Sequence, residues 1–293
     1  MAGRASPIFL DEWRTRQASL PGLEVRIRNR KRIAFGWYGG KYCHLAWLLP
    51  LLPRCHHYCE PFGGSAAVLL NREPSPVETY NDIDGDVVNF FRVLRDQTDR
   101  LLRAIALTPF SREEFNIACS GDGEEASELE RARRFFVRAR QVRTGLAQTA
   151  SVGRWANCKN TSRSGMSGVV SRWLGSVGML PDIAERLLCV QIENRPAVEV
   201  VRLYDHDETL FYCDPPYPHE ARGDDKAYGY EMTDEEHVQL ASTLSRVQGM
   251  VAVSSYRCDL MDELYRDFKR HDAPIKTCHS VKRPRQEALW VNY

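Results

Sequence analysis

The tetrapeptide Asp214-Pro215-Pro216-Tyr217 carries the clearest chemistry in the sequence. It follows the apolar run 210–213, which predicts a buried strand. The two prolines lack backbone N–H groups and fix φ at about −65°, so they end that strand at once. Open α/β sheets carry their sites at the carboxyl ends of strands. A carboxylate, a bare Pro215 carbonyl and an aromatic face held there suit an exocyclic amino group on a flat ring, most simply a nucleobase.

A glycine turn over 62–65 comes before an acid at a spacing typical of nucleotide sites. By itself such a turn can serve only tight packing, but Asp82 ends the next predicted strand, 18 residues beyond Gly64. An acid in that place can accept hydrogen bonds from both ribose hydroxyls. The turn does not match Gly-x-Gly-x-x-Gly, and the sequence has no Gly-x4-Gly-Lys-Ser/Thr run. These features favour a nucleotide cofactor without a pyrophosphate over NAD or ATP.

The segments around these residues predict alternating strands and helices. In the first third we expect a strand from Ile33 into a glycine turn, a helix over 46–52, a strand over 57–59, a helix over 66–70, a strand over 77–82 and a helix over 87–95. This order predicts a βαβ nucleotide-binding unit. The segment 144–180 is rich in Gly, Ser, Thr and Asn, which predicts loops. The sheet is expected to resume over 200–214, 250–254 and 288–293.

Positive charge gathers in one part of a chain whose net charge is only +1. From Arg131 to Trp173 there are ten Arg and Lys residues and no Asp or Glu. A solvated helix face usually mixes charges of both signs, so a purely basic block predicts contacts with the phosphates of DNA or RNA. The cations expected to bind nucleic acid are Arg138, Arg140, Arg143, Arg154, Lys159, Arg163 and Arg172.

Composition excludes several other classes of protein. The chain has 293 residues, 43% of them hydrophobic, and no apolar run long enough to span a bilayer, so we expect a soluble protein without a membrane partner. The first 32 residues lack the apolar core of a signal peptide, and nine scattered cysteines fit reduced thiols, so we expect a cytoplasmic location. The cluster Cys55-His56-His57-Cys59, with Cys43 and His44 upstream, is too loosely spaced to predict zinc, and no metal is expected.

Four motifs in a fixed order give the sequence a family resemblance. They are Trp37-Tyr38-Gly39-Gly40-Lys41, Glu60-Pro61-Phe62-Gly63-Gly64, Asn81-Asp82-Ile83-Asp84 and Asp214-Pro215-Pro216-Tyr217. With them the chain resembles the Dam-like (D12, alpha class) DNA adenine-N6 methyltransferases, and 287–293 is similar to the closing strand of phage and prophage members. The resemblance implies an α/β fold with a Rossmann-like mixed sheet. It also implies a basic arm over 1–32, a catalytic domain over 33–107 and 193–293, and a helical, loop-rich target-recognition domain over 108–192.

The resemblance also implies roles for individual residues. Asp214, Pro215, Pro216 and Tyr217 would hold the target adenine, and Asp82 would hold the ribose of S-adenosyl-L-methionine (AdoMet). The residues expected to bind this cofactor are Trp37, Tyr38, Gly39, Gly40, Lys41, Glu60, Pro61, Phe62, Gly63, Gly64, Ser65, Asp82, Ile83, Glu193 and Asp214. The sequence departs from the family at Ala66, where a glycine is usual. It also lacks the Asn-Arg-x-Gly-Tyr-Asn-Gly run of GATC-specific members, so a GATC target is not supported.

The expected function is therefore site-specific methylation of adenine N6 in double-stranded DNA. The target base would be flipped out of the duplex, and AdoMet would give its methyl group directly, leaving S-adenosyl-L-homocysteine. The motifs alone leave open transfer to cytosine N4 or RNA adenine, and a non-catalytic regulator that binds AdoMet and DNA. They also leave open a cognate restriction endonuclease or none, and a monomer or a dimer.

Overall fold

The computed structural model describes residues 31–121, 126–163, 165–221, 230–274 and 286–293. The predicted basic arm over 1–32 thus lies outside the described residues, apart from its last two. The chain divides into two compact units. The helical unit is Met1–Tyr38 with Asn89–Leu188, and the sheet unit is Gly39–Val88 with Cys189–Tyr293. The domain boundaries expected at 107–108 and 192–193 stay a prediction.

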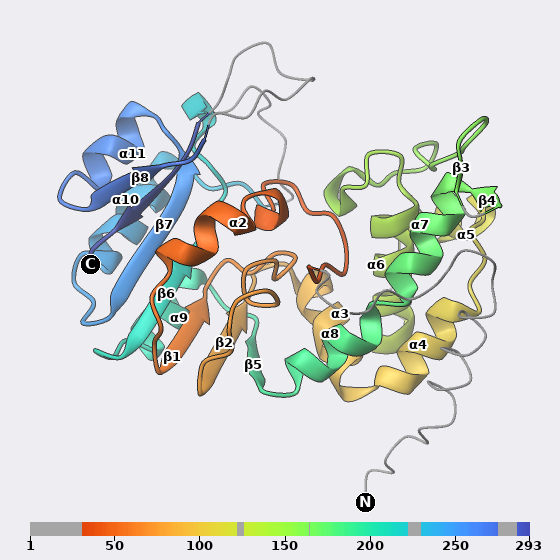
Figure 1. Cartoon of the computed structure of the whole chain (residues 1–293), viewed down its shortest axis with the longest axis horizontal. Helices are drawn as coiled ribbons and strands as arrows, with labels where there is room; N and C mark the ends of the chain where they lie inside the picture. Colours follow the sequence, from red (N-terminus) through yellow and green to blue (C-terminus); the bar gives the residue numbers. More distant parts are fainter. Residues whose placement is uncertain (1–30, 122–125, 164, 222–229, 275–285) are drawn as a thin grey trace, which may run out of the picture. The chain divides into compact units, whose positions relative to one another are not determined.

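The sheet unit contains a seven-stranded sheet in the order β5-β2-β1-β6-β7-β9-β8 (Figure 1). The first five strands of that order are parallel, and β9 is antiparallel to both of its neighbours. The sheet is mixed and mostly parallel, as in a Rossmann-like α/β fold, so the predicted fold class is confirmed. The strands are β1 (His57–Glu60), β2 (Val77–Asn81), β5 (Val190–Glu193), β6 (Thr209–Cys213), β7 (Met250–Tyr256), β8 (Lys269–Asp272) and β9 (Glu287–Val291).

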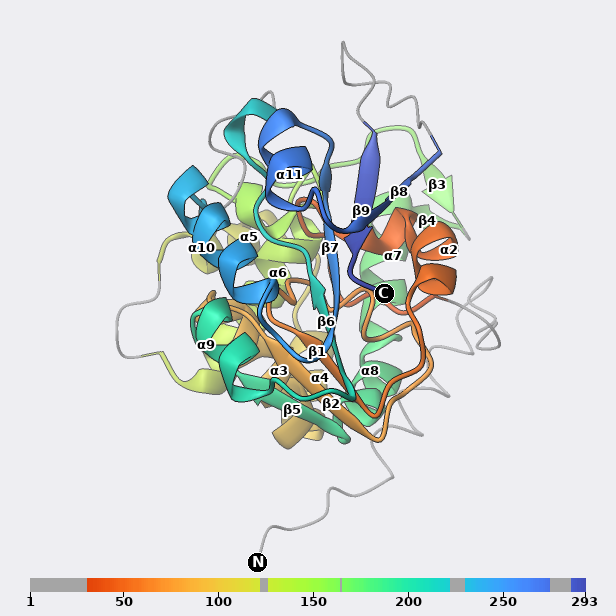
Figure 2. The same ribbon diagram turned by 90° about the vertical axis from the view of Figure 1, so that its left-hand side faces the viewer.

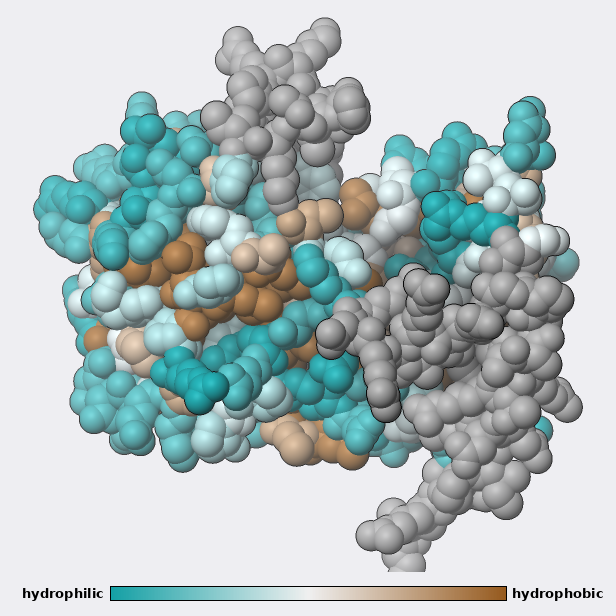
Figure 3. Space-filling view, in the orientation of Figure 1, coloured by the Kyte–Doolittle hydropathy of each residue, from teal (hydrophilic) through white to brown (hydrophobic). Residues whose placement is uncertain are grey.

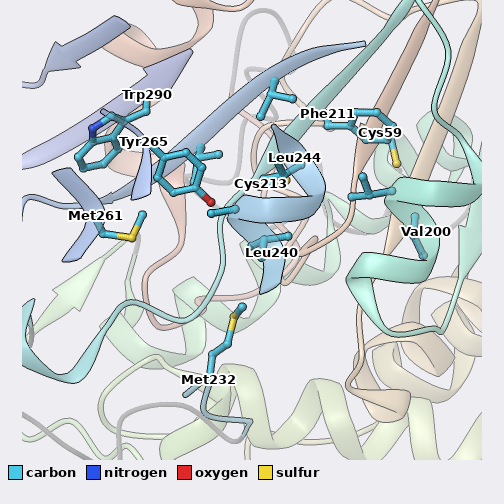
Figure 4. Close-up of a cluster of buried hydrophobic side chains, with 14 of the residues drawn as sticks. Cys59, Val200, Phe211, Cys213, Met232, Leu240, Leu244, Met261, Tyr265 and Trp290 are labelled. Carbon is cyan, nitrogen blue, oxygen red and sulfur yellow. The ribbon is translucent and has the colours of Figure 1, made fainter. Parts of the chain in front are cut away.

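Helices cover both faces of this sheet (Figure 2). On one face lie α9 (Ala197–Leu203), α10 (Asp234–Leu244) and α11 (Asp259–Leu264), and their apolar residues form a buried cluster with Phe211, Val253 and Trp290 (Figure 4). Thr233 begins α10 with a capping box that satisfies otherwise unpaired backbone N–H groups. The other face carries η1 (Lys41–Cys43), α2 (Leu45–Leu48) and η2 (Leu49–Leu51), and η4 (His219–Ala221) follows β6.

The helical unit packs around aromatic side chains. Phe35, Phe90, Phe135, Phe136 and Trp173 are each at most 4% exposed, and their rings contact one another in a chain. No helix among the described residues is long and apolar enough to cross a membrane. The elements of this unit are the later part of α3 (Gly85–Asp96), then α4 (Thr98–Ala106), α5 (Arg112–Cys119), α6 (Glu128–Gln141), η3 (Ala147–Thr149), β3 (Ser162–Arg163), β4 (Met166–Ser167), α7 (Gly168–Val177) and α8 (Leu180–Leu187).

Several predicted elements were wrong. No strand begins at Ile33. Phe35 instead packs in the core of the helical unit, against Phe90 of α3 and Phe135 of α6. The helix expected over 66–70 is a series of turns, because Gly64 and Ala66 have φ values of 48° and 53°, which interrupt helical geometry. The loop region over 144–180 contains α7, and the first residues of the strand expected over 200–214 belong to α9.

Candidate active site

The parallel strands of the sheet unit bring acidic and aromatic residues to one edge. Glu60 ends β1, Asp82 follows β2, Asp214 follows β6 and Tyr256 ends β7. Because β9 runs the opposite way, its first residue, Glu287, pairs with Tyr256 and reaches the same edge. Sequence reasoning missed Glu287, since a residue that begins a strand joins this edge only when that strand is antiparallel.

Lys41 lies between the Asp214 and Glu287 carboxylates. Its Nζ donates to both oxygens of Asp214 at 2.6 and 2.7 Å and lies 3.3 Å from Glu287 Oε1. A third hydrogen bond runs from Nζ to the Gly39 carbonyl at 2.7 Å. Gly39 has a φ of 73°, which favours glycine and accounts for a glycine two residues before the lysine. Lys41 is 3% exposed and Asp214 is 17% exposed, so the carboxylate keeps an accessible edge.

Burial and charge act against each other in this cluster. Burial raises the pKa of Asp214, the Lys41 ammonium lowers it and the Glu287 carboxylate raises it, and the net result is about 6. Burial lowers the pKa of Lys41, but the two carboxylates more than reverse this, so that pKa lies above its ordinary value. At neutral pH Lys41 is therefore charged and Asp214 is mostly ionised.

Tyr217 is held by its neighbours rather than open to solvent. Its hydroxyl donates to Glu287 Oε1, its ring meets Tyr256 edge to face at 4.9 Å, and Lys41 Nζ lies 4.9 Å from its ring centre. Its residue exposure is only 2%. The Pro215 carbonyl receives no hydrogen bond from any residue in the described ranges. The motif thus offers a partly exposed Asp214 carboxylate and a buried Pro215 carbonyl beside a ring fixed in orientation.

The glycine turn after β1 contacts Asp82 directly. The Gly64 N–H donates to Asp82 Oδ2 at 2.7 Å and the Asp84 N–H to Oδ1 at 2.8 Å. Burial raises the pKa of Asp82 to about 6 against these two hydrogen bonds. Gly63 has to be glycine because a Cβ there would lie 2.1 Å from the Tyr80 ring. Ala66, at the usual glycine position, has the φ of 53° that favours glycine.

Asn81 is a positioning residue that sequence reasoning missed. Its side-chain amide donates to the carbonyls of Pro61 and Arg195 at 2.8 and 3.0 Å, and its oxygen accepts from the Arg195 N–H at 2.9 Å. It thereby ties the turn after β1 to the chain that leaves β5. Glu193, expected at the cofactor, accepts instead from Tyr204 and Arg195 at 2.8 and 3.2 Å, and its cofactor role stays a prediction.

Glu60 is a buried acid that forms no ion pair with a cation among the described residues. The Tyr58 hydroxyl donates to Glu60 Oε1 at 2.7 Å, and Glu60 is 2% exposed. Burial raises the pKa of Glu60 to about 8 despite that hydrogen bond, so the group is mostly neutral at pH 7.

Cys59, next to Glu60 in β1, lies in the buried apolar cluster on one face of the sheet. No group of three or more potential metal ligands occurs among the described residues.

Two of the predicted cofactor residues belong to the helical unit. Trp37 packs its ring against Phe35, and the Tyr38 N–H donates to the Gln148 side chain at 3.2 Å. The remaining predicted cofactor residues, from Gly39 onward, belong to the sheet unit.

The cations of the basic block fall into two groups. Arg138 and Arg140, on α6, are half-buried and donate to the Ala118 carbonyl and the Ser176 hydroxyl. The second group is exposed and has no side-chain hydrogen bond or ion pair with any described residue. Its members are Arg143, Arg154, Lys159, Arg163 and Arg172. Hydrophilic residues predominate on the surface near β3 and β4 in the view of Figure 3.

Comparison with known proteins points to one family. The family model described as D12 class N6 adenine-specific DNA methyltransferase matches residues 37–276. Among solved structures, the rRNA methyltransferase aviRa from Streptomyces viridochromogenes is similar over 99% of this chain and 86% of that chain, at 13% identity and a TM-score of 0.32. A likeness this weak carries no argument about substrate. A search of the curated proteins finds no match.

Proposed function

Because the chain belongs to the D12 class N6 adenine-specific DNA methyltransferase family, we propose that it methylates N6 of an adenine flipped out of double-stranded DNA. The observation that carries the proposal is the Asp214 carboxylate, which Lys41 keeps mostly ionised at the edge of the sheet. The flipped base is required because N6 of a stacked and paired adenine is out of reach of such a group.

Asp214 and Pro215 supply the two acceptors that an exocyclic amine needs. Each carboxylate oxygen has two lone pairs, and Lys41 uses one on each. A remaining lone pair would accept one N6 hydrogen, and the Pro215 carbonyl the other. These bonds would turn the nitrogen lone pair out of conjugation with the ring. They would also stabilise the positive charge that grows on N6 during transfer, and Asp214 could take the released proton.

Tyr217 would stack on the flipped adenine, which contributes about 1–3 kcal/mol for a base on an aromatic ring. The ring is buried against Tyr256 and Lys41, so a bound base has to displace a neighbour of the ring before it can stack. The hydrogen bond from the Tyr217 hydroxyl to Glu287 would hold the far end of the ring in place while this happens. We therefore expect the adenine pocket to open on DNA binding.

The residues at the ends of β1 and β2 fit AdoMet. Asp82 is half-buried, and its oxygens keep lone pairs for two ribose hydroxyls beyond the backbone bonds from Gly64 and Asp84. Ile83 beside it is 46% exposed and offers an apolar surface for a flat ring. The cofactor supplies a methyl group on a sulfonium, which is electrophilic without any metal. Gly64 in the turn after β1 would place no side chain against it, whereas the Tyr80 ring fills the space beside Gly63.

The exposed cations of the helical unit would hold the DNA. Arg143, Arg154, Lys159, Arg163 and Arg172 have no described partner that competes with phosphate, so they are the stronger candidates. Arg138 and Arg140 already bind groups within the unit, so we assign them a supporting role. Contacts with phosphate position a protein on DNA, and contacts with base edges select the sequence.

Product analysis tests this function. Purified protein is incubated with labelled AdoMet and unmethylated genomic DNA, and the nucleosides are then identified. We expect N6-methyladenine at one short sequence. N4-methylcytosine would refute the choice of base. Label in RNA but not in DNA would refute the substrate, and binding of AdoMet and DNA without any transfer would favour the regulator.

A further inference from the structure

Glu287 is a buried carboxylate that the proposed reaction does not itself require. It is 4% exposed, begins β9 and pairs in register with Tyr256 at the end of β7. Its Oε1 accepts from the Tyr217 hydroxyl and lies 3.3 Å from Lys41 Nζ. One oxygen atom therefore contacts both the proposed stacking ring and the cation that holds Asp214.

Folding alone does not account for this arrangement. Placing a second carboxylate against one buried ammonium leaves a net negative charge out of water, which is costly, and a neutral group could accept the Tyr217 hydrogen bond equally well. The charge competes with Asp214 for Lys41. The Glu287 charge therefore changes the basicity of Asp214, whose partly exposed oxygens are acceptors in the proposed mechanism.

We propose that Glu287 is a positioning residue for methyl transfer, which fixes the Tyr217 ring through its hydroxyl and shares Lys41 with Asp214. The proposal rests on the proposed function of this same site. Sharing Lys41 leaves the Asp214 oxygens more basic than a fully neutralised carboxylate would be, and therefore better acceptors for an amine that is gaining positive charge.

The groups that face Asp214 come from several elements. They include Lys41 from η1, Glu287 from β9, the Tyr217 hydroxyl after β6 and Glu60 from β1, together with Tyr212 and Cys213 on β6 itself. Lys41 and Tyr217 lower the pKa of Asp214, Glu287 raises it, and Glu60 is mostly neutral at pH 7. Removing the Glu287 charge therefore lowers that pKa.

Two substitutions separate the two parts of this role. Glu287→Gln keeps an oxygen for the Tyr217 hydroxyl but removes the charge. We expect the acid limb of the kcat/KM profile to move to lower pH and kcat on its plateau to fall, with KM for DNA little changed. Glu287→Ala loses both contacts, and we expect kcat to fall at least about tenfold further, as for loss of a charged hydrogen bond. Glu263→Gln, the same change at an exposed position of α11, is the matched control.

Titration of Asp214 gives a readout that does not depend on activity. The ¹³Cγ resonance of Asp214 is identified by its absence in Asp214→Asn and followed against pH in the wild type, Glu287→Gln and Glu263→Gln. We expect a lower midpoint in Glu287→Gln only. An unchanged midpoint in folded Glu287→Gln overturns the inference, even where DNA methylation is observed. A lowered midpoint in a protein that methylates no DNA would support the coupling of the two carboxylates but overturn the proposed function and the role of Glu287 in it.

Discussion

Replacing Lys41 with methionine removes the cation from the centre of the candidate site while keeping most of its volume. Lys41 Nζ lies 2.6 and 2.7 Å from the Asp214 oxygens and 3.3 Å from Glu287. At these distances one ion pair is worth about 6 kcal/mol for an effective dielectric constant of about 20, before the cost of burial. Breaking a buried pair by removing one partner costs about 3–5 kcal/mol, which we expect for Lys41→Met at pH 8.

The loss of unfolding free energy in Lys41→Met should be larger at high pH than at low pH. Without Lys41 the pKa of Asp214 rises beyond its present value of about 6. An acid with a raised pKa in the folded state lowers the stability of that state as pH rises from the unfolded pKa to the raised one. The wild type stops losing stability through Asp214 at about pH 6, whereas Lys41→Met continues to lose it above that pH. The loss in Lys41→Met should therefore shrink between pH 8 and pH 5.

Urea unfolding at several pH values measures this effect, with Lys269→Met, at an exposed position of β8, as the control. The control should change stability by less than about 0.5 kcal/mol. An equal loss at pH 5 and pH 8, or a loss below about 1 kcal/mol at pH 8, would refute the electrostatic account of the cluster.

Three further outcomes are expected. Ala66→Gly should raise the free energy of unfolding by up to about 1 kcal/mol, because φ is 53° there, and a decrease would show that the buried methyl outweighs the strain. Arg143→Gln and Arg154→Gln should each weaken DNA binding and lower the slope of log affinity against log salt by about 1, whereas Arg54→Gln, in the sheet unit, should leave that slope unchanged. Glu60→Gln should remove a fall in stability that the wild type shows as pH rises from 4.5 to about 8, because folded Glu60 keeps a proton that the unfolded chain loses in that range, and a parallel pH dependence in both proteins would contradict this.

The sequence predicts this fold well where patterns are local. The Asp214 motif ends β6 as its two prolines require, and Asp82 follows β2 with the Gly64 N–H bonded to it. Local patterns failed at Phe35, whose apolar segment predicts a strand but fills the core of the helical unit. They failed again at Ala66, because a positive φ is a property of the backbone that apolar residues do not reveal.

Other parts of the site depend on contacts between distant segments. Glu287 meets Lys41 because β9 is antiparallel, which no pattern within 287–291 indicates. The motif over 81–84 does not reveal that the Asn81 amide joins the turn after β1 to the chain after β5. Composition predicts the basic block. It does not reveal that Arg138 and Arg140 donate hydrogen bonds to Ala118 and Ser176, which separates them from the exposed cations.

The most direct measurement compares wild-type protein with Asp214→Ala in one assay of methyl transfer to unmethylated DNA, with AdoMet and DNA binding measured alongside. If Asp214 accepts the N6 hydrogen, Asp214→Ala should bind both ligands and form N6-methyladenine at least about 100 times more slowly, the loss typical of a removed preorganised group. N6-methyladenine formed by Asp214→Ala at the wild-type rate would contradict the assignment of this carboxylate, and with it the proposed mechanism.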